Sequence, residues 1–67
     1  MIKKHHIIQI VEDIKNTANE LLEEERTDLV NGQLLAYAET LSILKSVFAG
    51  EDLKELGLDE DFDRKYL

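Results

Sequence analysis

The chain contains no cysteine, no proline and no tryptophan, and only three of its 67 residues are glycines. Without cysteine it forms no disulfide, no thiolate metal site and no cysteine nucleophile, and a reducing cytoplasm is the simplest compartment for it. Without proline and with few glycines, the chain has few positions that interrupt a helix, and its apolar residues recur at helical rather than alternating spacing. These features predict an all-α protein.

Basic residues are also scarce. Eight Lys and Arg stand against fifteen Asp and Glu, which gives a formal net charge of −7. Such a protein is repelled by the phosphate backbone of nucleic acids and by anionic lipid surfaces. The longest apolar run, residues 34–38, is far shorter than the roughly 18 to 20 residues that cross a bilayer, and the N-terminus has no secretory pattern. We therefore expect a cytoplasmic protein that binds neither nucleic acid nor membrane.

The chain is short enough that its stability is in question. A single core in a chain of fewer than about 70 residues rarely buries enough apolar surface to offset the conformational entropy of folding. Disulfides are absent and no metal site is evident, so self-association is the remaining common way for such a short chain to gain stability. The expectation is one domain, residues 1–67, that pairs with itself.

The first predicted helix covers residues 3–26. Its apolar residues follow one another at intervals of three and four, and charged residues fill the opposite side. This stripe consists of Ile7, Ile10, Val11, Ile14, Ala18, Leu21 and Leu22. The pattern predicts an amphipathic helix that buries one face.

The start of the second predicted helix, residues 28–49, is marked by two competing signals. Thr27 or Asp28 would cap a new helix, whereas Asn31-Gly32 would equally suit a turn. We favour the cap, because the apolar spacing already runs through the Asn-Gly pair. Gly32 then lies inside the helix, where it costs up to about 1 kcal/mol relative to alanine, a cost usually offset where another backbone comes close.

The second helix is too apolar for a simple hairpin. Between residues 29 and 49 only Glu39 and Lys45 are charged, and a shoulder of Gly32, Ala36, Ile43 and Val47 flanks the main stripe. A helix that hides most of its circumference needs more than one neighbour, which predicts a homodimer built as a four-helix bundle around this helix. The predicted core and dimer interface is Val30, Gly32, Leu34, Ala36, Tyr37, Leu41, Ile43, Leu44, Val47 and Phe48.

The remaining residues, 51–67, are predicted to fold back on the hairpin of residues 1–50 as an acidic clasp. Gly50 suits the end of the second helix, Gly57 suits the end of a short helix, and Asp59 suits the cap of a last turn. The clasp is expected to dock through Leu53, Leu56 and Phe62. Its candidate partner surface is Asp59, Asp61, Phe62, Asp63 and Tyr66.

No motif in the chain predicts catalysis or metal binding. His5 and His6 are adjacent, so on a helix they diverge by about 100° and do not share a metal. The Asp59, Asp61, Asp63 array resembles the opening of a calcium loop, but Arg64 stands where the loop needs glycine, and the chain ends before the twelfth ligand. No serine or threonine lies near a histidine in the sequence. We therefore predict no enzyme activity, no cofactor and no metal.

Two stretches carry a resemblance to a protein family. The sequences Gly-Gln-Leu-Leu-Ala-Tyr-Ala-Glu-Thr-Leu, residues 32–41, and Leu-Gly-Leu-Asp-Glu-Asp-Phe-Asp, residues 56–63, resemble short uncharacterised two-helix proteins of Gram-positive bacteria and their mobile elements. The resemblance covers about residues 28–67. It implies a helical hairpin that pairs with itself in a bacterial cytoplasm. It assigns no function to any particular residue of this chain.

The leading functional hypothesis is a non-enzymatic protein-interaction module that acts as a homodimeric helical bundle and engages another protein. One alternative is an acidic antitoxin-like or inhibitor protein that occupies a basic site on its partner. Another is a small enzyme with a site at the dimer interface, which would need convergent ionisable groups.

Overall fold

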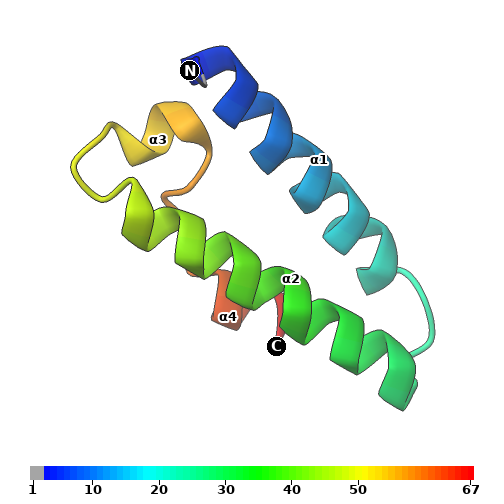
Figure 1. Ribbon diagram of the computed structural model, residues 1–67. Coiled ribbons are helices and arrows are strands. Elements are labelled where there is room, and N and C mark those ends of the chain that lie inside the picture. Colours follow the sequence, from blue (N-terminus) through cyan, green and yellow to red (C-terminus); the bar gives the residue numbers. More distant parts are fainter. Residues whose placement is uncertain (1–2) are drawn as a thin grey trace.

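The computed structural model describes residues 3–67, and the described chain is all-helical. Its four helices are α1 (Lys4–Leu22), α2 (Asp28–Val47), α3 (Leu53–Leu56) and α4 (Phe62–Tyr66). The two long helices run antiparallel and form a hairpin (Figure 1). The predicted all-α hairpin is therefore confirmed.

The start of α2 follows from its cap. The hydroxyl of Thr27 accepts a hydrogen bond from the backbone N–H of Val30 at 3.2 Å, and Asp28 lies in the first turn, where the helix dipole favours a negative charge. Asn31 and Gly32 lie inside the helix, as the continuous apolar spacing predicted.

The long helices end earlier than predicted. Helix α1 stops at Leu22 rather than near residue 26, because Glu23, Glu24 and Glu25 place negative charge at the negative end of the helix dipole. Helix α2 stops at Val47 rather than at residue 49, and Phe48 is its C-cap residue. Gly50 lies in the following turn, and among the described residues only Gly57 has a positive φ.

The C-terminal segment folds into two short helices joined by a bend. Asp52 caps α3 by accepting from the N–H of Glu55 at 3.3 Å, and Gly57, with φ of 77°, ends it. Asp61 caps α4 by accepting from the N–H of Arg64 at 3.2 Å. The predicted cap at Asp59 is thus wrong by two residues, although the predicted helical turn forms.

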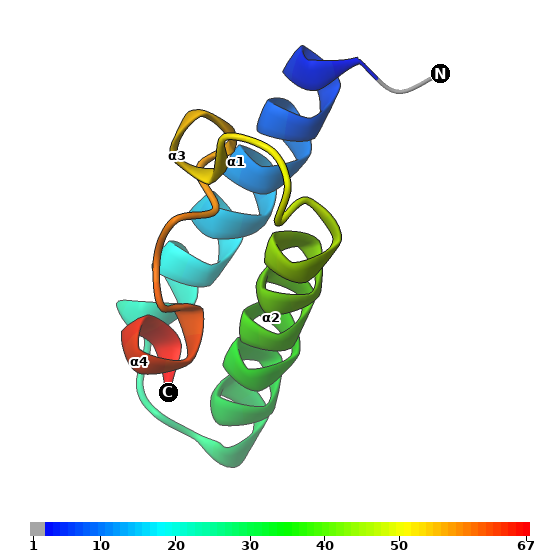
Figure 2. The ribbon, with the colours of Figure 1, turned by 90° about the vertical axis from the view of Figure 1, so that its left-hand side faces the viewer.

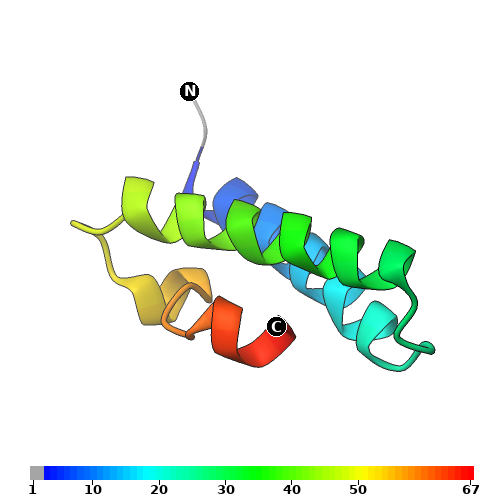
Figure 3. The same cartoon turned by 90° about the horizontal axis from the view of Figure 1, so that it is seen from below.

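The two short helices cover different parts of the hairpin: α3 lies at the end where α1 begins, and α4 lies beside the middle of α2 (Figure 1). Helix α3 packs against α1, and α4 packs against α2 (Figures 2 and 3). We call residues 51–67 the C-terminal clasp. The clasp, rather than a second copy of the chain, provides α2 with its second neighbour in this structure.

The core is shared by the hairpin and the clasp. Ten apolar or aromatic side chains are buried, and four of them belong to the clasp. The ten are Val11, Ala18, Val30, Leu34, Ala38, Leu41, Leu56, Leu58, Phe62 and Tyr66. Because so much of the core comes from residues 56–66, the hairpin and the clasp form one folding unit.

Candidate interaction surface

The predicted core and interface residues of α2 separate into two groups. Six of them face the interior of the single chain. Val30, Leu34 and Leu41 are buried, while Tyr37, Leu44 and Phe48 are half-buried against the core. These six side chains are satisfied within one copy, so they are core rather than interface.

The other four predicted residues are exposed on the opposite side of α2. They are Gly32, Ala36, Ile43 and Val47, and Leu29 extends the same stripe by one turn. We call these five residues the outer face of α2. Figure 2 shows α1, α3 and α4 together on one side of α2, and the outer face lies on the other side.

The outer face exposes large apolar side chains. Leu29 is 72% exposed, Ile43 is 62% exposed and Val47 is 67% exposed. Single exposed apolar residues are ordinary on protein surfaces, but a row of them along one helix face is typical of an interaction site. The sequence pattern indicates this face because its residues repeat at intervals of three, four and seven.

Gly32 lies on the outer face without a neighbour in its own chain. Among the described residues, no atom outside its local helix lies within 4 Å of the position that a Cβ would take. An interior helical glycine costs roughly 0.5 to 1 kcal/mol relative to alanine. The close backbone approach that would offset this cost is not provided by the clasp or by α1.

The outer face carries little charge. Between Leu29 and Val47 the charged residues are Glu39 and Lys45. Lys45 turns toward the clasp, where its Nζ donates to the carbonyl oxygen of Glu60 at 2.8 Å. Glu39 is exposed beside Thr40 at the middle of the helix. The chain's negative charge therefore lies mainly elsewhere.

The candidate partner surface of the clasp is only partly exposed. Asp59, Asp61 and Asp63 are exposed, but Phe62 is 1% exposed and Tyr66 is 0% exposed. The two rings stack, with centroids 6.4 Å apart, on the interior side of α4. The prediction that Phe62 and Tyr66 face a partner is corrected by this burial, which follows from their spacing of four residues on one helix face.

Polar contacts fix the clasp to both long helices. The hydroxyl of Tyr66 donates to Oδ1 of Asn19 at 2.9 Å, and the guanidinium of Arg26 donates to the carbonyl oxygen of Tyr66 at 3.3 Å. At the bend between α3 and α4, Nζ of Lys15 donates to the carbonyl oxygen of Gly57 at 3.1 Å. The middle and the last turn of the clasp are thus tied to the hairpin.

Glu60 is the centre of a small ionic network. Its carboxylate pairs with Lys15 through Oε2 and accepts from Nζ of Lys65 at 2.9 Å through Oε1. The hydrogen bond from Lys15, followed by that from Lys65, holds the pKa of the Glu60 carboxyl below its ordinary value. The same pairing raises the pKa of the Lys65 ammonium. The network links α1 and α4 through a single glutamate.

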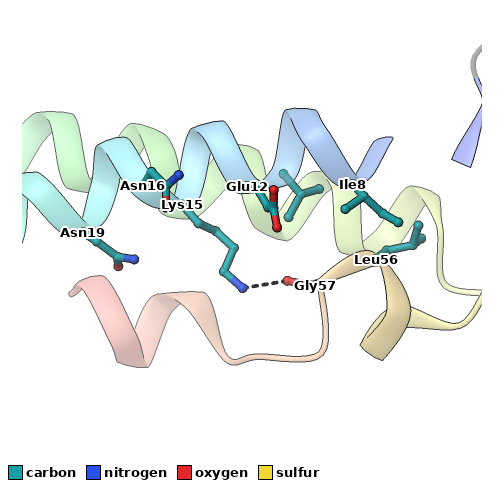
Figure 4. Close-up of a pocket in the computed structure, with 8 residues that line it drawn as sticks. Ile8, Glu12, Lys15, Asn16, Asn19, Leu56 and Gly57 are labelled. Atoms are coloured by element: carbon teal, nitrogen blue, oxygen red, sulfur yellow. Dashed lines mark hydrogen bonds between the residues drawn. The ribbon is translucent and has the colours of Figure 1, made fainter. Parts of the chain in front are cut away.

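The pocket between α1 and α3 is small and already partly filled. It has a volume of about 180 Å³, and Figure 4 shows Lys15 reaching across it to Gly57. Ordinary ligand pockets measure about 300 to 1,000 Å³. Its lining is Ile8, Val11, Glu12, Lys15, Asn16, Asn19, Leu56 and Gly57, which includes no serine, threonine, cysteine or histidine. Among the residues of this lining there is thus no hydroxyl or thiol nucleophile and no imidazole base.

The two histidines lie close together, although their adjacent helix positions predict divergent side chains, and they have no third metal ligand beside them in the described residues. The rings of His5 and His6 lie side by side at the exposed start of α1, with centroids 4.1 Å apart. Within residues 3–67, no three histidine, aspartate or glutamate side chains come together in a way that would hold a metal ion. In the same part of the chain, no helix has both the length and the apolar composition needed to cross a bilayer.

Sequence reasoning missed the residues that fasten the clasp. Lys15, Asn19 and Glu60 lie outside the apolar stripes, and their partners are between 5 and 47 residues away in the chain. Lys15 and Asn19 share one helix face at an i,i+4 interval beside the stripe, which was the one available signal. Their charge or polarity alone did not distinguish them from solvated residues.

The chain matches no protein-family model, no curated protein and no solved structure.

Proposed function

We propose that the protein is a non-enzymatic protein-interaction module that acts as a homodimer through the outer face of α2. The observation that carries this proposal is the row of exposed apolar side chains at Leu29, Ile43 and Val47, on the side of α2 opposite the one that packs against α1 and α4. In a dimer, the two α1–α2 hairpins form a four-helix bundle, with the two copies of α2 at its centre. The lack of cysteine fits a reducing cytoplasm.

The size of the chain supports self-association. The protein exposes 4750 Å² in total, and its core contains ten buried side chains. Burying a Leu, Ile or Val side chain contributes about 1.5 to 3 kcal/mol, so covering three such side chains in each copy adds substantially to a typical stability of 5 to 15 kcal/mol. Dimerisation thereby adds buried apolar surface, which a single small core has too little of.

A matched pair of variants tests this proposal. Ile43 and Leu67 are similarly exposed, at 62% and 58%, but only Ile43 belongs to the outer face. We expect Ile43→Asp to sediment as a folded monomer, because a carboxylate there would be buried without a partner in the dimer. Leu67→Asp should sediment as a dimer, like the wild type. A dimeric Ile43→Asp protein with native helix content would contradict the proposal.

An inhibitor that occupies a basic partner is the second candidate. It is supported by the exposed carboxylates of Asp59, Asp61 and Asp63 on an ordered clasp. Such a complex would weaken steeply with salt, because screening reduces attraction between exposed charges. A captured basic protein that is released by salt, and that binds the Ile43→Asp monomer equally well, would favour this function over the dimeric module.

A further inference from the structure

We infer that the two copies of α2 pair antiparallel, with the two-fold axis of the dimer passing between Glu39 and Thr40. This inference rests on the proposed function, because it specifies how the second copy occupies the outer face of α2. Its basis is the order of small and large side chains along that face.

Between Gly32 and Val47 the outer face is small in its first half and large in its second half. Leu29, one turn earlier, lies as far from the midpoint between Glu39 and Thr40 as Gly50 does. Gly32 and Ala36 come first, and Ile43 and Val47 follow. Gly32 and Val47 lie equally far from the midpoint between Glu39 and Thr40, and the same holds for Ala36 and Ile43. A two-fold axis through that midpoint therefore places Gly32 opposite the partner's Val47 and Ala36 opposite the partner's Ile43.

This pairing of large with small side chains keeps the distance between the two helix axes constant along the contact. Each large side chain meets a small one, so the packing is filled along the whole contact. In a parallel dimer, Gly32 would meet its own copy at one end and Val47 would meet its own copy at the other. The helices would then be held apart at the valines, and the contact at the glycines would be left empty, which forfeits dispersion contacts.

Gly32 supports the same arrangement independently. The space over its Cα is open among the described residues, so its lack of a side chain serves no contact within the chain. A branched side chain from a second copy would fill that space, and Val47 of the partner subunit is the residue that the symmetry brings there.

The distribution of charge favours a second copy on this face. Each molecule carries a net charge of −7, so two copies repel one another over most of their surfaces. Residues 51–67 alone hold seven acidic and three basic residues, whereas residues 29–47 hold Glu39 and Lys45. The outer face of α2 brings one acidic residue per copy, Glu39, to the contact, and the acidic clasp lies away from it (Figure 3).

The dimensions of the molecule are consistent with this face. An interface of standard size buries about 800 Å² on each partner, which is about one sixth of the 4750 Å² that this protein exposes. Such an area requires one of the long sides of a molecule that measures 37 × 18 × 17 Å. Helix α2, about 30 Å long, supplies a long side, and its exposed apolar residues run from one end to the other.

Disulfide cross-linking tests the orientation, because the wild-type chain has no cysteine to interfere. Gly32→Cys and Val47→Cys chains are mixed, refolded together under reducing conditions and then oxidised. A disulfide forms only when the two Cα atoms approach to about 4.4 to 6.8 Å. In the antiparallel dimer each cysteine lies about 22 Å along the helix from its own copy and opposite the other variant.

The expected product is a disulfide between one Gly32→Cys chain and one Val47→Cys chain, identified by its intact mass. A disulfide between two Val47→Cys chains would overturn the antiparallel orientation. So would a dimer that does not form the mixed disulfide. Sedimentation of the reduced wild type separates the two proposals, because a monomer there overturns the proposed function itself. Ala36→Cys mixed with Ile43→Cys repeats the test if Gly32→Cys prevents dimerisation, and again the mixed disulfide is expected.

Discussion

The hydroxyl of Tyr66 donates a hydrogen bond to Oδ1 of Asn19 at 2.9 Å, which joins the last helical turn of the chain to the second half of α1. The ring of Tyr66 is buried in the core, while Asn19 lies at the surface. This contact makes the C-terminus part of the folded unit, and its partners are 47 residues apart in the sequence.

Replacing Tyr66 with phenylalanine should lower the free energy of unfolding by about 0.5 to 1.5 kcal/mol, which is the net contribution of a typical hydrogen bond. The ring remains in place, so the change isolates the hydroxyl. For a domain of this size, each 1 kcal/mol corresponds to about 4 to 8 °C in Tm. Denaturant unfolding measures the loss. In the Asn19→Ala background the same replacement should cost much less, and an equal cost in both backgrounds would show that the contact contributes nothing.

Truncation after Gly50 should unfold the chain. It removes Leu56, Leu58, Phe62 and Tyr66 from the core, each worth about 1.5 to 3 kcal/mol, against a typical total stability of 5 to 15 kcal/mol. Circular dichroism of the shortened protein should show most of the helical signal lost at 25 °C. A truncated protein that keeps the wild-type Tm and native helix content would contradict the shared core.

Leu41→Asp and Ile43→Asp should have different effects, although the two positions are only two residues apart in the sequence. Leu41 is 0% exposed within one copy, so an aspartate there places an unpaired carboxylate in the core at a cost of several kcal/mol and unfolds the protein. Ile43→Asp leaves the folded monomer intact. Far-ultraviolet circular dichroism distinguishes them, and equal helix content in the two variants would show that Leu41 is not a core residue.

The Glu60 network should make stability depend on pH in the acid range. The hydrogen bonds from Lys15 and Lys65 lower the folded-state pKa of Glu60 below 4.5, so the unfolded state binds a proton more readily. The stabilisation is present above pH 4.5 and is lost as the pH falls through the lower folded-state value. Because Glu60 is about one-third exposed, solvent screens the effect and keeps it small. Denaturant unfolding from pH 7 to pH 3 should show wild type and Glu60→Gln converging as the pH falls, whereas a constant difference would contradict the network.

Gly32→Ala should have opposite effects on the monomer and on the dimer. In the monomeric Ile43→Asp background, alanine raises helix propensity and should stabilise the fold by about 0.5 to 1 kcal/mol, because the added methyl group meets open space. In the otherwise wild-type chain, the methyl group would crowd Val47 of the partner subunit and weaken dimerisation. Thermal unfolding measures the first effect and sedimentation the second. Tighter dimerisation of the Gly32→Ala protein would contradict close approach at Gly32.

Local signals in the sequence were sufficient for the helices and most of their ends. Apolar spacing located α1 and α2, Thr27 marked the start of α2, and Gly57 marked the end of α3. The predicted end of α1 is misplaced because residues 23–26 contain no glycine or proline to mark a stop, although the helix dipole disfavours their acidic side chains there. Propensity and spacing act within a few residues, which is the range over which these predictions hold.

Long-range packing was less predictable. The apolar composition of α2 predicts a second copy as the additional neighbour of this helix, whereas α4 of the same chain covers part of its apolar surface. The side on which the clasp docks depends on contacts such as those of Lys15 with Gly57 and Glu60, and no local pattern specifies those partners. The shoulder of Gly32, Ala36, Ile43 and Val47 is the part of the surplus that the single chain leaves exposed.

Sedimentation equilibrium of the wild-type protein at micromolar concentration tests the central claim most directly. One chain has a mass of 7.7 kDa. A dimer that pairs through the outer face of α2 predicts a fitted mass of twice that value, falling toward the single-chain mass on dilution. A folded protein whose mass stays at 7.7 kDa up to the highest micromolar concentration would contradict it.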